Sequence, residues 1–457
     1  MRSQPSHAVH RRPLGWAVAL LLLLTSCTTQ PWHQSLPTNW KGTHALLAPP
    51  PPAPLPDGAI NPDSLSGKVM AGYQGWAVAE GDGSEIGWTH YGVNSSQRSA
   101  RVTRRFSPGS AVIDMWPDLT EAGLGERYPT EFRFADGSVA EVTTARHPDT
   151  IDRHFRWMEE YGIDGVFLQR FVTTLSQMPQ AAMRNAVFRG VRTGAARHGR
   201  TWALMYDLSG SRSGTIEKAV MDDWRRMVDL GRIRDDPRLQ RHAGKPVVAL
   251  WGVGFKDGRQ YTLAECERLI RWLKDDPVYG GNTVVLGVPY RWREQTNDAV
   301  ADPELLRVLA LADVLSPWAV GRLKTPEDAR RTSETMVTAD LAWTGSRGLS
   351  YLPVIYPGFS WHNLQRSRGN EAAFDAIPRQ RGEFFRSLAA GTLAGGATML
   401  YVAMFDEIDE GTAVMKTSQN PPGGESPFLH EEGVPSDYYL RLTGEIRQWL
   451  RTSTANR

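Results

Sequence analysis

Eight short apolar segments, each followed by a longer stretch of mixed polarity, are the feature that most constrains the fold of this chain. The segments carry few charges before their last residues, as strands covered on both faces must. They are residues 69–73, 165–171, 201–207, 246–252, 283–289, 313–318, 351–356 and 397–405. Repeated alternation of strand and helix predicts a parallel sheet, and eight units fit a closed (β/α)8 TIM barrel. An open doubly wound sheet is the alternative, but no glycine-rich nucleotide fingerprint follows any segment.

We expect the barrel to occupy residues 67–452 as a single domain. The first strand is followed by residues 77–149, a stretch too long for a simple loop. It contains a further apolar run at 111–116 and a hairpin-like stretch at 131–138 with Asp-Gly at its turn. We therefore expect an elaborated first βα loop that covers the carboxyl ends of the strands.

The first 26 residues have the pattern of an export signal, with arginines followed by an apolar stretch at 14–24. That stretch is too short to span a bilayer as a stable helix. Its end, Leu-Thr-Ser-Cys, resembles a bacterial lipobox, which implies cleavage before Cys27 and lipid attachment to its sulfur. With Thr28 next, we expect an exported protein anchored to the outer membrane. Cleavage as an ordinary signal peptide is the alternative.

Residues 27–66 are expected to form a tether. Prolines at positions 49–52, 54 and 56 should keep this segment extended and stiff. If Cys27 carries lipid, Cys266 has no cysteine to pair with. Cys266 shares a helical face with Leu263 and Ile270, so we expect a buried apolar residue and not a nucleophile.

Aromatic, amide and charged side chains gather where the predicted strands end. In a barrel these ends converge on one pocket. Each ring by itself is more often core packing, but together they suit a sugar, whose C–H faces lie on rings while its hydroxyls take polar partners. The expected substrate-binding residues are Tyr73, Trp76, Gln169, Arg170, Asp207, Trp251, Tyr290, Trp318, Trp361 and His362.

Four carboxylates, Asp406, Glu407, Asp409 and Glu410, follow the last apolar segment. A solvated acidic loop is one interpretation. The other is an acid and a base at the end of a barrel strand, because two carboxylates in a dry pocket push one pKa up. We expect Asp406 and Asp409 to have structural roles, holding arginines or the strand-end backbone.

Several other kinds of site are disfavoured. The net charge is +2 and there is no Lys/Arg-rich stripe, so no nucleic-acid partner is expected. His90 and His362 lack the spacing of metal ligands, and we expect no metal. The serines lack the Gly-x-Ser-x-Gly elbow of a serine hydrolase.

The acidic segment, Glu407-x-x-Glu410-Gly-Thr, resembles the motif of glycoside hydrolase family 99. The wider resemblance is to bacterial proteins classed as like families 71 and 99, some of which carry xylosidase or arabinosidase labels. Segments 68–76, 360–363 and 403–407 also resemble that group, and the similarity covers roughly residues 68–449.

This resemblance implies a (β/α)8 barrel and a retaining glycosidase without metal or organic cofactor. It implies that Glu407 takes a proton from the sugar 2-hydroxyl, giving a 1,2-anhydro sugar, while Glu410 protonates the leaving oxygen. The chain departs from the family motif, because Ile408 and Asp409 stand where family 99 has Trp and His. In an ordinary double displacement Asp207 would instead be the nucleophile facing Glu410.

Two alternatives from other classes stay open at this stage. One is a carbohydrate-binding lipoprotein on a barrel scaffold that lacks catalysis. The other is a barrel enzyme of different chemistry, such as a lyase, which leaves an unsaturated sugar. The expected partners in every case are a carbohydrate and, through Cys27, a membrane.

Overall fold

The computed structural model describes residues 32–94, 104–430 and 432–455. The export signal and Cys27 lie outside these ranges. Within them, no helix combines the length and the apolar composition needed to cross a bilayer.

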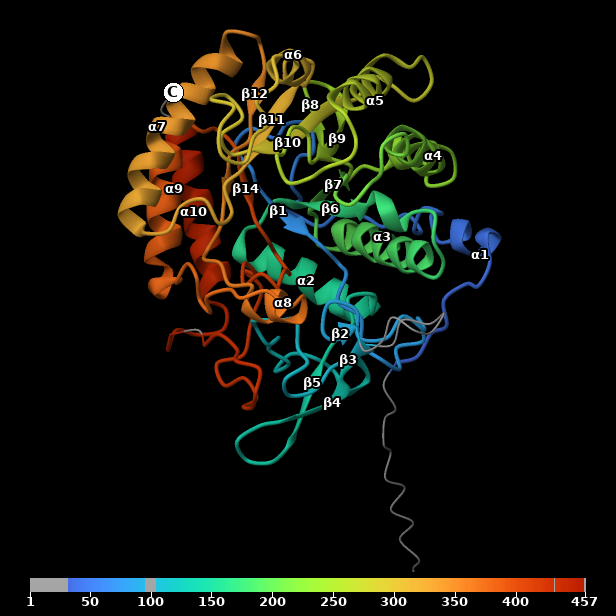
Figure 1. The fold of residues 1–457 in the computed structure, drawn as a ribbon. Coiled ribbons are helices and arrows are strands. Elements are labelled where there is room, and N and C mark those ends of the chain that lie inside the picture. Colours follow the sequence, from blue (N-terminus) through green and yellow to red (C-terminus); the bar gives the residue numbers. More distant parts are fainter. Residues whose placement is uncertain (1–31, 95–103, 431, 456–457) are drawn as a thin grey trace, which may run out of the picture.

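The core of the molecule is a parallel sheet that closes into a barrel (Figure 1). Its strands, in order around the sheet, are β12 (Ser350–Tyr351), β11 (Val314–Trp318), β10 (Thr283–Pro289), β9 (Lys245–Trp251), β7 (Thr201–Asp207), β6 (Gly165–Phe171), β1 (Val69–Tyr73), β14 (Leu400–Val402) and β13 (Val354–Ile355). β12 and β13 are successive parts of one segment, interrupted at Pro353, which has no N–H to donate. Because β12 pairs with β11 and β13 pairs with β14, this segment joins the two edges of the sheet. The (β/α)8 prediction is confirmed.

Helices surround the sheet and follow its strands in turn (Figure 1). They are α2 (Pro148–Tyr161), α3 (Gln180–Arg197), α4 (Ile216–Asp229), α5 (Leu263–Asp275), α6 (Glu304–Leu309), α7 (Pro326–Gly345), α9 (Glu383–Ala394) and α10 (Tyr438–Ala455). α5 shows how the sequence sets these bounds: Thr262 caps it, and the Glu265 side chain bonds back to the cap backbone. Its apolar face includes buried Cys266, and burial raises the pKa of that thiol to about 12.

Shorter elements fill the connections. They are α1 (Trp40–Ala45), β2 (Val93–Asn94), β3 (Arg104–Arg105), η1 (Leu124–Glu126), β4 (Tyr128–Arg133), β5 (Val139–Val142), η2 (Val172–Thr174), η3 (Ile233–Asp235), β8 (Arg241–His242), α8 (His362–Ser367) and η4 (Gln380–Gly382). In the first βα loop, β4 and β5 form an antiparallel hairpin. At its turn Asp136 accepts the Ser138 N–H at 2.9 Å, and Gly137 has a φ of 83°. The same loop bonds to the segment after β14, where Asp114 N donates to Ile408 O at 2.9 Å. It therefore lies beside the acidic segment.

The N-terminal segment lies along the barrel. We expected a tether at 27–66, but the described part, from residue 32, buries Leu36, Leu47 and Leu65 against the domain. Its backbone also bonds to the domain, as where Ile60 N donates to Gly199 O at 2.8 Å. The proline-rich stretch between these contacts is mostly exposed and has no regular structure, as expected of such a composition. The segment therefore covers the domain and does not hold it at a distance.

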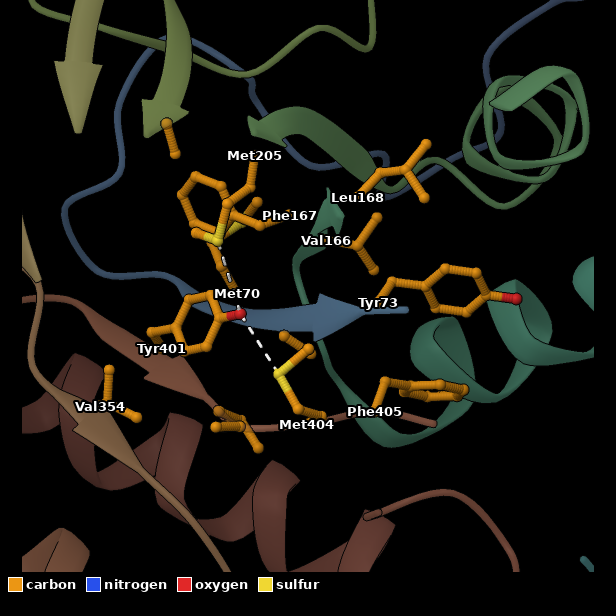
Figure 2. Packing of buried hydrophobic residues seen from close by; sticks show 14 of the residues in the cluster. Met70, Tyr73, Val166, Phe167, Leu168, Met205, Val354, Tyr401, Met404 and Phe405 are labelled. Carbon is orange, nitrogen blue, oxygen red and sulfur yellow. Dashed lines mark hydrogen bonds between the residues drawn. The ribbon is translucent and has the colours of Figure 1, made fainter. Parts of the chain in front are cut away.

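Tyr401 of β14 occupies the middle of the barrel. Figure 2 shows its hydroxyl between the sulfurs of Met205 and Met404, and the Met404 sulfur lies 3.4 Å away. The ring approaches β1 closely at Gly72, where an added Cβ would lie 2.2 Å from the Tyr401 hydroxyl oxygen. The barrel interior is thus filled by side chains below the level of the acids.

Candidate active site

Asp406 fastens the acidic segment to the end of β1. Its two carboxylate oxygens accept the backbone N–H groups of Gln74 and Gly75, at 2.7 and 2.8 Å. This is the strand-end role expected of it. Burial raises the pKa of Asp406 to about 6, although the two hydrogen bonds act to lower it.

Glu407 is held in a fixed orientation beneath the surface. Its side chain is 4% exposed. The Gln74 amide Nε2 donates to one oxygen at 2.9 Å, and the Thr412 hydroxyl lies 3.3 Å from the other. Burial, and then the charge of Glu410, raise the pKa of Glu407 well above its ordinary value.

Glu410, three residues after Glu407, is half-buried. Burial, and then the charge of Asp409, raise the pKa of Glu410 to about 7, and Asp207 of β7 adds to the effect. The carboxyl group of Glu410, after β14, is therefore close enough to that of Asp207, at the end of β7, for their charges to interact. Because the first charge on Glu407 or Glu410 opposes the second, ionisation of both carboxyl groups at once is disfavoured.

Asp409 is paired with a histidine from the first βα loop. Its buried Oδ2 lies 3.0 Å from Nδ1 of His90, whose side chain is 30% exposed. The imidazole stacks on Trp76, with ring centres 3.7 Å apart, and Trp76 stacks on Phe171 at the end of β6. Burial lowers the pKa of His90, so the ring is neutral at ordinary pH. We expected an arginine or backbone partner for Asp409, and the structure gives it an imidazole.

Five of the predicted substrate residues lie at the inner face of the strand ends: Trp76, Gln169, Asp207, Trp251 and Trp318. The Gln169 amide lies 3.3 Å from the Tyr401 hydroxyl. Asp207 accepts the Ser209 N–H at 2.7 Å, and burial raises the pKa of its carboxyl. Trp251 and Trp318 are half-buried and meet edge to face at 5.3 Å. Trp251 is the register partner of Asp207, so the two rings lie next to that carboxyl group.

Tyr73 and Arg170 face the other way, which corrects the expectation that they line the pocket. The Tyr73 hydroxyl lies 2.9 Å from Nδ1 of His154 on α2, and Figure 2 shows the ring pointing away from Tyr401. Arg170 makes a two-pronged ion pair with Asp223 of α4, with both contacts at 2.8 Å. Successive side chains on a strand point to opposite faces, so Arg170 cannot share the inner face with Gln169.

Tyr290, Trp361 and His362 lie in the connections at this end of the barrel, with His362 as the first residue of α8. Trp361 and His362 are half-buried and next to Ser360, whose N–H donates to the backbone oxygen of Glu410 at 3.0 Å. They are therefore adjacent to the acidic segment. Tyr290 is buried under the Arg291 guanidinium, and among the described residues no hydrogen bond or ring contact joins it to the acids.

Three residues that sequence reasoning did not assign belong to the site. Gln74 and His90 contact the acids directly, as described above. Arg184 of α3 donates to Gln74 O at 3.2 Å and lies over Phe171 at 5.2 Å. Burial lowers the pKa of Arg184 to about 10, against the opposing charges of Asp406 and Asp207. Gln74 was visible as the residue after β1, whereas nothing in the helical pattern of α3 marks Arg184.

The chemistry of this group is that of an acid and a base beside aromatic rings. Within the described ranges, no three His, Cys, Asp or Glu side chains are arranged to hold a metal ion. What the residues present can supply is proton transfer at two carboxyl groups and a surface for an apolar ring face.

Comparisons with known proteins bear on the fold. No protein-family model matches this chain, and no curated protein matches it. The structure of the GH99 endo-alpha-mannosidase from Bacteroides thetaiotaomicron superposes with a TM-score of 0.62 at 16% identity, covering 86% of this chain and 100% of that one. Its complex with bis-tris-propane gives a TM-score of 0.61 at 15% identity over the same shares. This chain therefore has a fold similar to that of a family 99 endo-α-mannosidase.

Proposed function

We propose that this protein is a glycoside hydrolase that cleaves glycosidic bonds of a polysaccharide or glycan. The observation that carries the proposal is the pair of buried Glu407 and half-buried Glu410 at the carboxyl end of a barrel strand, where burial and neighbouring carboxylates raise the pKa of both. A carboxyl group with a raised pKa can act as a general acid at ordinary pH. Tryptophans at the same strand ends suit a pyranose, and the fold similarity to an endo-α-mannosidase supports the proposal.

The contacts of the two carboxyl groups indicate their roles. Gln74 and Thr412 donate to Glu407, and such donors favour the ionised form. Neighbouring carboxylates favour the protonated form of both groups, and Arg368 opposes this at Glu410. We assign Glu407 as the base and Glu410 as the acid from the resemblance of this segment to the family 99 motif, and the two hydrogen bonds that fix Glu407 support the assignment.

In the first step Glu407 takes the proton of the sugar 2-hydroxyl, and that oxygen attacks the anomeric carbon. The bond to the leaving oxygen breaks as Glu410 gives it a proton, and a 1,2-anhydro sugar remains. In the second step Glu410 takes a proton from water, which attacks the anomeric carbon, and Glu407 returns its proton to the 2-oxygen. Two inversions give overall retention of configuration.

Double displacement through Asp207 is the second candidate mechanism. It is favoured by the inward position of Asp207 and by its electrostatic contact with Glu410. It also gives retention, so the stereochemistry does not separate the two schemes. Replacing Asp207 by Asn separates the two schemes. If Asp207 is the nucleophile, the variant loses turnover. If it is not, the variant keeps turnover and binds the sugar more weakly.

The test of the function is digestion of a glycan panel that contains yeast mannan, arabinoxylan and arabinan, followed by NMR of the first product formed. We expect hydrolysis of at least one member, with the new reducing end in the configuration of the original bond. Binding without turnover would make the protein a carbohydrate-binding lipoprotein. An unsaturated product would identify a lyase. Either result would overturn the proposal.

We also propose that the protein is exported and anchored by lipid at Cys27, from its resemblance to a lipobox. Trp32 N already bonds to Gly125 O at 2.6 Å, so the anchor would hold the domain close to the bilayer. Replacing Cys27 by Ala should leave the unprocessed chain and abolish incorporation of labelled palmitate. A wild-type protein that partitions into water, or a processed Cys27→Ala variant, would contradict the anchor.

A further inference from the structure

A cavity lies at the rim of the barrel, away from the acid pair. It has a volume of about 420 Å³ and lies between α1 and the start of α4. Its lining includes Leu175, after β6, and Gly214, after β7, so it opens at the end of the barrel that holds the acids. Figure 1 shows α1 at the edge of the molecule near α3 and α4. The volume is within the range of cavities that bind small ligands.

The helix that forms one wall is held firmly on the domain. Asn185 of α3 donates to Thr43 O at 3.0 Å, and Arg189 donates to Ala45 O at 2.9 Å. The buried Thr43 hydroxyl contacts the Met178 sulfur at 3.0 Å. These contacts fix the position of α1 on the domain, and therefore the backbone that carries Trp40.

Trp40 leaves much of its ring open within this cavity. Its side chain is 42% exposed, and its nearest ring partner is His44, with centres 5.6 Å apart and planes 38° apart. A single exposed apolar residue needs no explanation by itself. Here, however, the indole lines a concave space instead of protruding into solvent.

Polar groups surround the open ring. Lys218 and Asp222, one turn apart on α4, form an ion pair at the lining, and Arg226 follows on the same face. The hydroxyls of Ser176 and Thr215 also line the cavity. Arg226 lies 3.8 Å from Asp223, so each cation of the lining has a carboxylate near it, which suits a neutral sugar. A ring for C–H faces beside donors and acceptors for hydroxyls is the combination that a pyranose requires.

We propose that the cavity around Trp40 is a carbohydrate-binding subsite that holds a part of the glycan distant from the bond being cleaved. The proposal rests on the proposed function for the identity of the ligand. It assigns to the N-terminal segment a role in substrate binding, which its packing on the barrel permits. The subsite would raise the affinity for long chains without contacting the reacting atoms.

The test is electrophoresis in gels that contain yeast mannan or arabinoxylan, with full-length Glu410→Gln so that the polysaccharide is not cleaved. Trp40→Ala in that background should weaken the retardation by at least one of them about tenfold, since loss of a stacked ring is of that order. The matched control is Trp449→Ala, which removes another surface indole, 36% exposed, from α10. Trp40→Phe should keep part of the binding, and circular dichroism of all variants checks the fold.

Equal retardation of the Trp40→Ala and Trp449→Ala variants, or no retardation of the parent protein by either polysaccharide, would overturn the proposal. So would a Trp40→Ala variant that keeps its polysaccharide binding and loses binding to phosphatidylethanolamine–phosphatidylglycerol vesicles, since Trp40 would then be a membrane contact. In the otherwise wild-type protein, Trp40→Ala should leave hydrolysis of a short aryl glycoside unchanged. If no hydrolysis is ever found but Trp40→Ala still weakens binding, the proposed function fails and the subsite stands.

Discussion

The amide of Gln74 is expected to set the proton affinity of Glu407. Its Nε2 donates to Glu407 at 2.9 Å, whereas its own Oε1 is buried and has no hydrogen-bond partner among the residues that the structure describes. A hydrogen bond to a charged group contributes about 1.5–3 kcal/mol. One pKa unit corresponds to about 1.4 kcal/mol. Replacing Gln74 by Met, which keeps the shape and removes the donor, should therefore raise the pKa of Glu407 by about 1–2 units.

The base must be ionised to act, so its higher pKa moves the acidic limb of the pH profile of kcat/KM upward by the same amount. At pH values below that limb kcat/KM should fall about 10–100-fold. The assay is kcat/KM from pH 4 to pH 10 on the substrate that the glycan panel identifies. The matched control is Gln169→Met, which removes another buried amide that contacts Tyr401 and not Glu407.

The fold should tolerate this change. A swap that conserves volume costs less than about 1.5 kcal/mol, and the lost hydrogen bond is partly offset by removal of the unpaired Oε1. An acidic limb that stays in place in a folded Gln74→Met variant would refute the reasoning. So would an equal shift in Gln169→Met, because the effect would not then depend on the contact with Glu407.

The other predictions concern the remaining groups of the site. Glu410→Gln should raise the free energy of unfolding at pH 8 by at most about 3 kcal/mol and leave it unchanged at pH 4. The folded Glu410, with pKa about 7, keeps a proton that the unfolded chain releases near pH 4.5, so wild-type stability falls as the pH rises between these values. Denaturant melts at both pH values check this, and equal melts of variant and wild type at pH 8 would contradict it. His90→Ala should lower kcat/KM about tenfold in a folded protein, because Asp409 loses its partner, and an unchanged kcat/KM would show that this pair has no role. Arg170→Met should cost about 3–5 kcal/mol of stability, because buried Asp223 loses its two-pronged partner and keeps only the Tyr206 hydroxyl at 2.9 Å and Arg226 at 3.8 Å. KM should be unchanged for the folded fraction, and a raised KM in a stable variant would show that Arg170 contacts the substrate.

The barrel strands were readable from the sequence because a strand covered on both faces must be apolar along its length. β1, β6, β7 and β10 begin and end at the predicted residues. The last apolar segment was predicted as 397–405, but only Leu400–Val402 pair as a strand. The flanking residues are as apolar as the strand because they are buried too, so composition does not mark where pairing ends.

The side chains of the site were partly predictable. Asp207, Trp251 and Trp318 lie at inward strand-end positions, as expected because the strand ends of a barrel meet in one place, and their contact with a sugar stays a prediction. Tyr73 and Arg170 were misplaced because every polar residue near a strand end was assigned inward, while strand alternation allows only every second one.

His90 and Arg184 come from a long loop and from a helix, and their contacts with the site depend on tertiary packing that no local pattern encodes. The packing of the N-terminal segment on the barrel also depends on tertiary contacts that no local pattern encodes. Its scattered leucines bury themselves on the barrel, while its prolines alone predict a free extended chain.

The roles of Glu407 and Glu410 can be separated most directly by the leaving group. Kinetics of the Gln variants should be measured on the natural linkage and on a 2,4-dinitrophenyl glycoside, whose leaving oxygen needs no proton. We predict that Glu410→Gln loses about 100–10,000-fold in kcat on the natural linkage. On the dinitrophenyl substrate it should keep most of kcat/KM, which reports the first step, while kcat falls because the second step still needs Glu410 as base. Glu407→Gln should lose kcat/KM on both substrates. Wild-type turnover of the natural linkage by either variant would contradict the account.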